Sequence, residues 1–223
     1  MPDEQGAPTR TARSVPTFPW SAPGRWRPRP VSAVVLLGGL WLFGTGEALI
    51  VAARLGNSPW SVLGGGLARR LGLSIGVVTI IVSTVVLLGW IPLRQRPGLG
   101  TVANVIVIGV ALDVMGRALP EPHSLAVRIA FGVGGVVVIA AGGALYLSTH
   151  LGPGPRDGWM TGIAHRTGRP IARVRLAIEA AVLVVGIALG GRFGAVTVLF
   201  ALSIGHVLAF LLALLARLTA ATT

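Results

Sequence analysis

The sequence contains no cysteine and no lysine, and charged residues make up only 12% of its 223 residues. The lack of cysteine excludes disulfides, thiolate metal sites and cysteine nucleophiles, and the lack of lysine excludes Schiff-base chemistry. A soluble domain carries about 25% charged residues. Hydrophobic residues make up 53% of the chain, and its mean hydropathy is +0.78. These values predict an all-α, polytopic membrane protein.

The charges that are present are mostly arginines, and the formal net charge is +12. In a soluble chain, such a large net positive charge would suggest nucleic acid as a partner. Here the arginines lie between apolar segments, so anionic lipids of the bilayer are the expected counter-charge and no nucleic acid is expected.

Apolar runs of about twenty residues are long enough to cross a bilayer as helices. The sequence contains six such runs, at Val31–Ala53, Ser74–Leu93, Gly100–Leu119, Leu125–Thr149, Ile171–Gly190 and Gly194–Leu218. They predict a transmembrane domain over residues 31–218. The preceding residues 1–30 hold seven of the fifteen prolines and are interpreted as a disordered tail, and residues 219–223 as a C-terminal tail.

The two halves of the predicted transmembrane domain resemble each other when the chain is shifted by 96 residues. About three in ten positions between Gly38 and Leu119 are then identical, against about one in ten expected by chance. Pro59 falls on Pro155 and Gly72 on Gly168. We therefore predict two repeats, at 31–119 and 127–215. Each holds three spans, and an odd number places the second repeat upside down in the bilayer.

The arginines also predict an orientation. With the N-terminus in the cytoplasm, the predicted inner segments hold thirteen arginines and the outer segments six. Cytoplasmic loops are enriched in arginine and lysine, so both termini are expected on the cytoplasmic side.

Two equivalent connectors follow the first span of each repeat, and each is predicted to be a short helix that begins at a proline. Ser58 and Asp157 are expected to cap these two helices, and Gly72 and Gly168 to end them. An amphipathic helix in the lipid headgroup region is the favoured interpretation, because Trp60 begins an apolar stripe. The alternative is a pair of re-entrant half-helices whose N-termini meet at the midplane and bind a polar or anionic solute.

Charged residues inside spans are costly and are therefore functional candidates. Glu47 lies close enough to the end of its span to reach the interface. Asp113 and Glu179 are expected to form ion pairs with Arg117 and Arg175, each four residues away. The predicted solute or ion pathway consists of Glu47, Asn57, Ser58, Pro59, Trp60, Pro155, Arg156, Asp157 and Glu179.

No motif for a catalytic, metal or cofactor site is found, so no catalytic residue, metal or cofactor is predicted and the protein is not expected to be an enzyme. Two functions remain open. One is a transporter-like protein for a small polar or anionic solute at the repeat interface. The other is a non-transporting accessory or assembly factor that holds a cytoplasmic partner.

Several motifs together resemble one family. They are Gly46-x-Ala48-Leu49 with Leu55-Gly56-x-x-Pro59-Trp60, Trp90-Ile91-Pro92-Leu93-Arg94, Leu151-Gly152-Pro153-Gly154-Pro155-Arg156-Asp157, and Arg173-x-Arg175-x-x-Ile178-Glu179. This combination is similar to the YczE-type membrane proteins of bacteria, which are related to the YitT group. The resemblance covers about residues 31 to 210 and implies a multi-pass protein of the bacterial cytoplasmic membrane, with no settled biochemical activity to carry over.

Overall fold

The computed structural model describes residues 15–169 and 171–220, and within these ranges the chain is helical, with a single isolated β-bridge between Gly24 and Arg27. The helices are α1 (Pro30–Ala53), α2 (Pro59–Leu71), α3 (Ile75–Leu88), α4 (Trp90–Leu93), α5 (Leu99–Ala118), α6 (Leu125–Ser148), α7 (Pro155–Thr167), α8 (Ile171–Ala188) and α9 (Ala195–Ala220).

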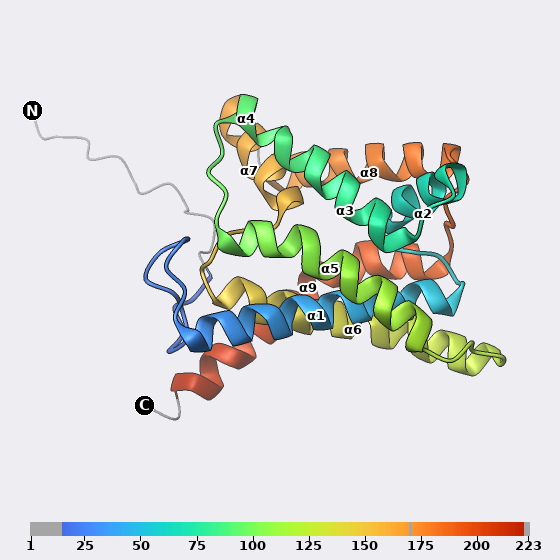
Figure 1. Cartoon of the computed structure of the whole chain (residues 1–223), viewed down its shortest axis with the longest axis horizontal. Helices are drawn as coiled ribbons and strands as arrows, with labels where there is room; N and C mark the ends of the chain where they lie inside the picture. The colour runs from blue at the N-terminus through green and yellow to red at the C-terminus, as the bar shows by residue number, and fades with distance from the viewer. Residues whose placement is uncertain (1–14, 170, 221–223) are drawn as a thin grey trace, which may run out of the picture.

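The helices form two layers (Figure 1). In the lower layer of the view, α1 and α6 lie side by side and run in opposite directions, with α5 packed on α1 and α9 packed on α6. The upper layer contains α3 and α8. The short helices α2 and α7 pack against α3 and α8, and they lie at opposite ends of the bundle. Gly72 and Gly168 end them in the left-handed conformation, with φ of 68° and 65°, as the sequence predicted.

Glycines allow α1 and α6 to approach until their backbones touch. A Cβ atom on Gly39 would lie 2.9 Å from the carbonyl oxygen of Gly142, and a Cβ on Gly46 would lie 2.8 Å from that of Gly135. Lipid tails are as apolar as leucine, so helices in a bilayer associate through such close packing rather than through a hydrophobic force. The α1–α6 crossing is therefore a close helix contact that glycine makes possible.

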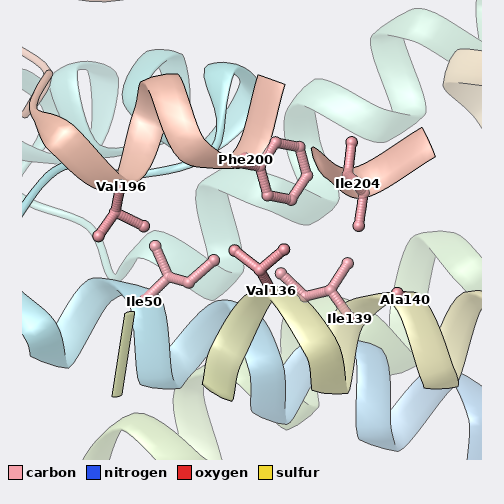
Figure 2. Close-up of a cluster of buried hydrophobic side chains, with 7 residues drawn as sticks. All are labelled: Ile50, Val136, Ile139, Ala140, Val196, Phe200 and Ile204. Atoms are coloured by element: carbon pink, nitrogen blue, oxygen red, sulfur yellow. The ribbon is translucent and has the colours of Figure 1, made fainter. Parts of the chain in front are cut away.

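A hydrophobic cluster joins α1, α6 and α9 (Figure 2). It contains Ile50, Val136, Ile139, Ala140, Val196, Phe200 and Ile204. The outer surface is apolar as well: Val34, Ile91 and Leu202 are each at least 70% exposed. Large exposed apolar surfaces are rare on soluble monomers, so these faces indicate contact with lipid.

Five helical segments in the described residues are long and apolar enough to cross a membrane. They are Pro30–Ala53, Ile75–Leu93, Leu99–Ala118, Leu125–Ser148 and Ala195–Ala220. They match five of the six predicted spans. The sixth prediction falls on α8, which is a continuous helix but carries Arg173, Arg175 and Glu179. Three charged residues in 18 are too many for a typical lipid-facing span, and α8 is not among the five.

Residues 15–29 differ from the disordered tail expected over residues 1–30. The Trp20 indole donates a hydrogen bond to Ser148 Oγ at 2.8 Å, and the Arg25 guanidinium donates one to the carbonyl of Arg96 at 2.8 Å. Phe18 is buried beside them. Aromatic and polar contacts thus hold this proline-rich segment against the ends of α5 and α6, which composition alone did not reveal. The predicted tail residues 1–14 and 221–223 lie outside the described residues.

Backbone conformations recur at the offset of 96 residues. Among the described residues, every positive φ belongs to a pair at this spacing: Arg54 and His150, Gly56 and Gly152, Gly72 and Gly168, and Arg94 and Gly190. Two loop-to-helix hydrogen bonds are paired in the same way. The amide of Val196 donates to the carbonyl of Leu55 at 3.0 Å, and the amide of Gly100 donates to that of Leu151 at 2.8 Å.

Candidate functional site

Glu47 is turned inward from α1 toward the start of α2. Its side chain is 2% exposed, and its carboxylate accepts hydrogen bonds from Ser58 Oγ at 3.0 Å to each oxygen and from Ser61 Oγ at 2.7 Å. Its distance from the end of the span had suggested that the carboxylate could reach the membrane surface. Instead, the carboxylate is bound inside the protein. Ser58 was predicted to cap α2, but its hydroxyl is used by Glu47 and makes no cap hydrogen bond.

The small residues of α2 form its packing face. Ser61, Gly64, Gly65 and Ala68 are buried, whereas Leu71 is 53% exposed. The leucines of the predicted apolar stripe therefore do not form the face of α2 that packs on the protein. Small side chains let α2 enter the bundle and touch α8, where a Cβ on Gly66 would lie 3.0 Å from the carbonyl of Gly186.

A cavity of about 260 Å³ lies between the two layers, next to the first turns of both α2 and α7. Trp60 of α2 lines it from one side, and Pro155 and Arg156 of α7 line it from another. Side chains of α1, α3, α5, α6, α8 and α9 complete its wall, including Phe43, Ser83, Asn104, Tyr146, Glu179 and Ile204. Ligand sites typically combine such an apolar wall with a few convergent polar groups.

Arg156 is the second residue of α7, and its guanidinium carbon lies 4.8 Å from the centre of the Trp60 ring. This cation–π contact joins the first turns of the two short helices. Within the described part of the chain, Arg156 makes neither an ion pair nor a hydrogen bond. Burial lowers the pKa of Arg156, and the negative charges of Glu47 and Asp157 oppose this change.

Three further charged groups on the cavity wall have partners. The Arg175 guanidinium is 2.9 Å from the Glu179 carboxylate, so the predicted ion pair on α8 is confirmed. Asp157 accepts a hydrogen bond from the Tyr146 hydroxyl at 3.1 Å. This contact ties the first turn of α7 to α6, as the Glu47 contacts tie the first turn of α2 to α1.

A second cavity, of about 470 Å³, lies toward the end of the bundle that carries α2. Arg54, Asn57 and Arg192 line it, and none of its lining residues is shared with the first cavity. On α1, Phe43 lines the first cavity and Ala48 lines the second. Glu47 lies between these two residues along the helix, and therefore between the two cavities. The structure thus places two cavities in sequence along the helix axes, with the Glu47 cluster at their boundary.

The predicted pathway residues divide among these features. Trp60, Pro155, Arg156, Asp157 and Glu179 line the first cavity and Asn57 the second. Glu47 and Ser58 lie between the cavities, and Pro59 is buried as the first residue of α2. The sequence did not single out Tyr146, which lines the first cavity, or Ser61, which bonds to Glu47, because a serine or tyrosine in an apolar run carries no pattern that distinguishes a site residue from a packed one.

Asp113 was expected to pair with Arg117, and this prediction is wrong. Its carboxylate accepts a hydrogen bond from the amide of Gly76 at 2.9 Å and another from the hydroxyl of Ser74. The first turn of a helix has free N–H groups and a partial positive charge that attract a carboxylate. Asp113 thus fastens α5 to the start of α3.

These features define a multi-pass helical membrane protein with a cavity whose largely apolar wall carries a few polar and charged groups. The chain belongs to the family described as "Family of unknown function (DUF6198)", which matches residues 31–213. The resemblance to YczE-type membrane proteins is thereby confirmed.

Three relatives are similar over most of the chain. A Haemophilus influenzae protein described as uncharacterized is 41% identical over 209 residues, which cover 94% of this chain and 96% of the relative. The "Uncharacterized membrane protein YczE" of Bacillus subtilis is 33% identical and covers 77% of this chain and 81% of its own. The Bacillus subtilis "Uncharacterized protein YyaS" is 29% identical, over 72% of this chain and 82% of the relative. No solved structure matches the chain significantly.

Proposed function

We propose that α8 also crosses the membrane and that the chain forms two inverted units of three spans each. Opposite directions of α1 and α6 and the placement of α2 and α7 at opposite ends support this arrangement (Figure 1). The paired positive-φ residues and the paired hydrogen bonds at Leu55 and Leu151 support it further. In this arrangement α8 keeps Glu179 toward the protein, where its side chain is 16% exposed and is paired with Arg175, and the exposed Arg173 lies in the first turn of the helix.

The excess of arginine in the loops at one end favours both termini in the cytoplasm of a bacterial cell. Arg166 lies in the last turn of α7 and Arg169 follows the helix at that end, and both are exposed. In this orientation α2 enters from outside and α7 from the cytoplasm, so the first cavity lies toward the cytoplasmic side and the second toward the outside.

The function proposed for this arrangement is transport of a small polar solute through the first cavity, rather than catalysis. The single observation that carries it is the convergence of the first turns of α2 and α7 on one internal cavity, since helix N-termini attract polar and anionic groups. The second cavity supports it as well, because a transporter must offer access from each side of the membrane in turn.

Uptake by purified protein in proteoliposomes tests this function across a panel of labelled polar metabolites. We expect at least one solute to accumulate well above empty liposomes. Gly143, which lines the cavity, is then replaced by leucine to fill it, and uptake is expected to fall at least about tenfold. Gly134→Leu is the matched control, because Gly134 has open space around it on the same helix. Normal uptake by a well-folded Gly143→Leu variant would exclude this cavity as the route.

A further inference from the structure

Arg156 presents donor groups that no described residue uses. Its guanidinium lies in the wall of the first cavity and over the Trp60 ring, without a hydrogen bond or ion pair to any described residue. The two other half-buried arginines of the described residues do have such partners: Arg128 donates to the carbonyls of Ala53 and Arg54, and Arg175 pairs with Glu179. A guanidinium has five N–H donors whose planar fork matches a carboxylate. Its partner is therefore expected to come from the solute.

A second unused donor lies at the same place. The indole Nε1 of Trp60 is buried and has no hydrogen-bond partner among the described residues, and Trp60 is 8% exposed and lines the cavity. A buried N–H without an acceptor loses its hydrogen bonds to water without compensation, so such groups are rare unless a ligand satisfies them. Arg156 and Trp60 are also the second residues of their helices, where the partial positive charge of the helix favours an anion.

The other charges around the cavity argue against a solute that is purely anionic. Asp157 and Glu179 line the cavity, and the negative charge of Glu47 acts on Arg156 from the cavity boundary. These three carboxylates face two guanidiniums, those of Arg156 and Arg175. An anion would add a second excess negative charge to a site whose wall is largely apolar, which is unfavourable. A solute that carries a cationic group as well as an anionic one leaves the net charge of the site unchanged.

We propose that the transported solute is a zwitterion with a carboxylate and an ammonium group, of the amino acid class. Its carboxylate binds Arg156 and the Trp60 indole N–H, and its ammonium group lies toward the acidic side chains of the wall. A cavity of about 260 Å³ holds the volume of about nine water molecules, which suits a single small metabolite. The proposal rests on the transport function above for its biological meaning, but the binding site can be tested without transport.

Binding to the purified protein in detergent is measured by calorimetry with the twenty amino acids. The best ligand is then compared with its amine, which lacks the carboxylate, and with its acid, which lacks the ammonium group. We expect the amino acid to bind at least about tenfold more tightly than either analogue. The Arg156→Gln variant should weaken binding of the amino acid and of the acid about 30-fold, and leave the amine unchanged. Arg117→Gln, an exposed arginine outside both cavities, is the matched control.

Three results would overturn the proposal: no binding of any amino acid, an acid that binds as tightly as the amino acid, or an Arg156→Gln variant that behaves like Arg117→Gln. Size-exclusion chromatography and melting temperature establish that each variant is folded. Uptake is measured separately. Binding without uptake would contradict the transport function and leave the zwitterion site standing, whereas uptake of a solute of another class would contradict the zwitterion alone.

Discussion

Gly142→Ala is expected to destabilise the protein by at least about 2 kcal/mol, although alanine is the better helix former. The new Cβ would lie 2.5 Å from both the carbonyl oxygen of Gly39 and the amide nitrogen of Phe43. These are backbone atoms and cannot turn away, so α1 and α6 must separate. Separation removes the close packing that holds helices together in lipid. Thermal unfolding in detergent, followed by circular dichroism, measures the effect as a melting temperature lowered by several degrees.

Gly134→Ala is the matched control for this variant, because a Cβ on Gly134 of the same helix meets nothing within 4 Å. Its helix propensity improves by up to about 1 kcal/mol, so its stability is expected to stay constant or rise. The opposite sign of the two changes is the critical result. Equal melting temperatures for the two variants would show that α1 and α6 do not touch at this glycine.

The second large effect is expected at the Glu47 cluster. A double variant with Ser58→Ala and Ser61→Ala removes the three hydrogen bonds that the two hydroxyls donate to the Glu47 carboxylate. A carboxylate that is 2% exposed then loses the donors that compensate its removal from water. We expect a loss of about 3 kcal/mol or more in the free energy of unfolding, measured in the same thermal assay.

Adding Glu47→Met to this double variant should restore most of the stability, to within about 1 kcal/mol of the original protein. Replacing all the partners of a buried polar cluster with apolar groups is nearly neutral, whereas leaving one partner unsatisfied is costly. Ser203→Ala is a control for loss of a serine hydroxyl, since Ser203 bonds only to a carbonyl of its own helix among the described residues. A triple variant as unstable as the double variant would show that the hydroxyls act through another contact.

The helix order was largely predictable from sequence because hydropathy reports directly on length and lipid exposure. Five spans, both short connector helices and their glycine ends agree with the structure. Which face of α2 packs was not predictable from its leucines. Leu71 faces outward and Gly66 touches α8, because in a helix that enters a bundle the small residues mark the contact and the large ones fill the remaining space.

Side-chain partners within the site were harder to predict than the residues themselves. Trp60, Arg156 and Glu179 were selected as pathway residues, and all three line one cavity. The sequence spacing correctly predicted the ion pair between Arg175 and Glu179, because residues four apart on one helix lie next to each other. It assigned Asp113 wrongly, because Ser74 and Gly76 lie about forty residues earlier in the chain and reach it only through tertiary packing.

The inverted arrangement of the two halves is tested most directly by single cysteines introduced into this naturally cysteine-free chain. Leu71 and Thr167 are equivalent at the 96-residue offset, both are exposed, and they lie at the far ends of α2 and α7. With a membrane-impermeant maleimide applied to intact cells, Leu71→Cys should be labelled at once and Thr167→Cys only after the membrane is opened. Labelling of both cysteines from the same side would contradict the inverted arrangement and the transport route built on it.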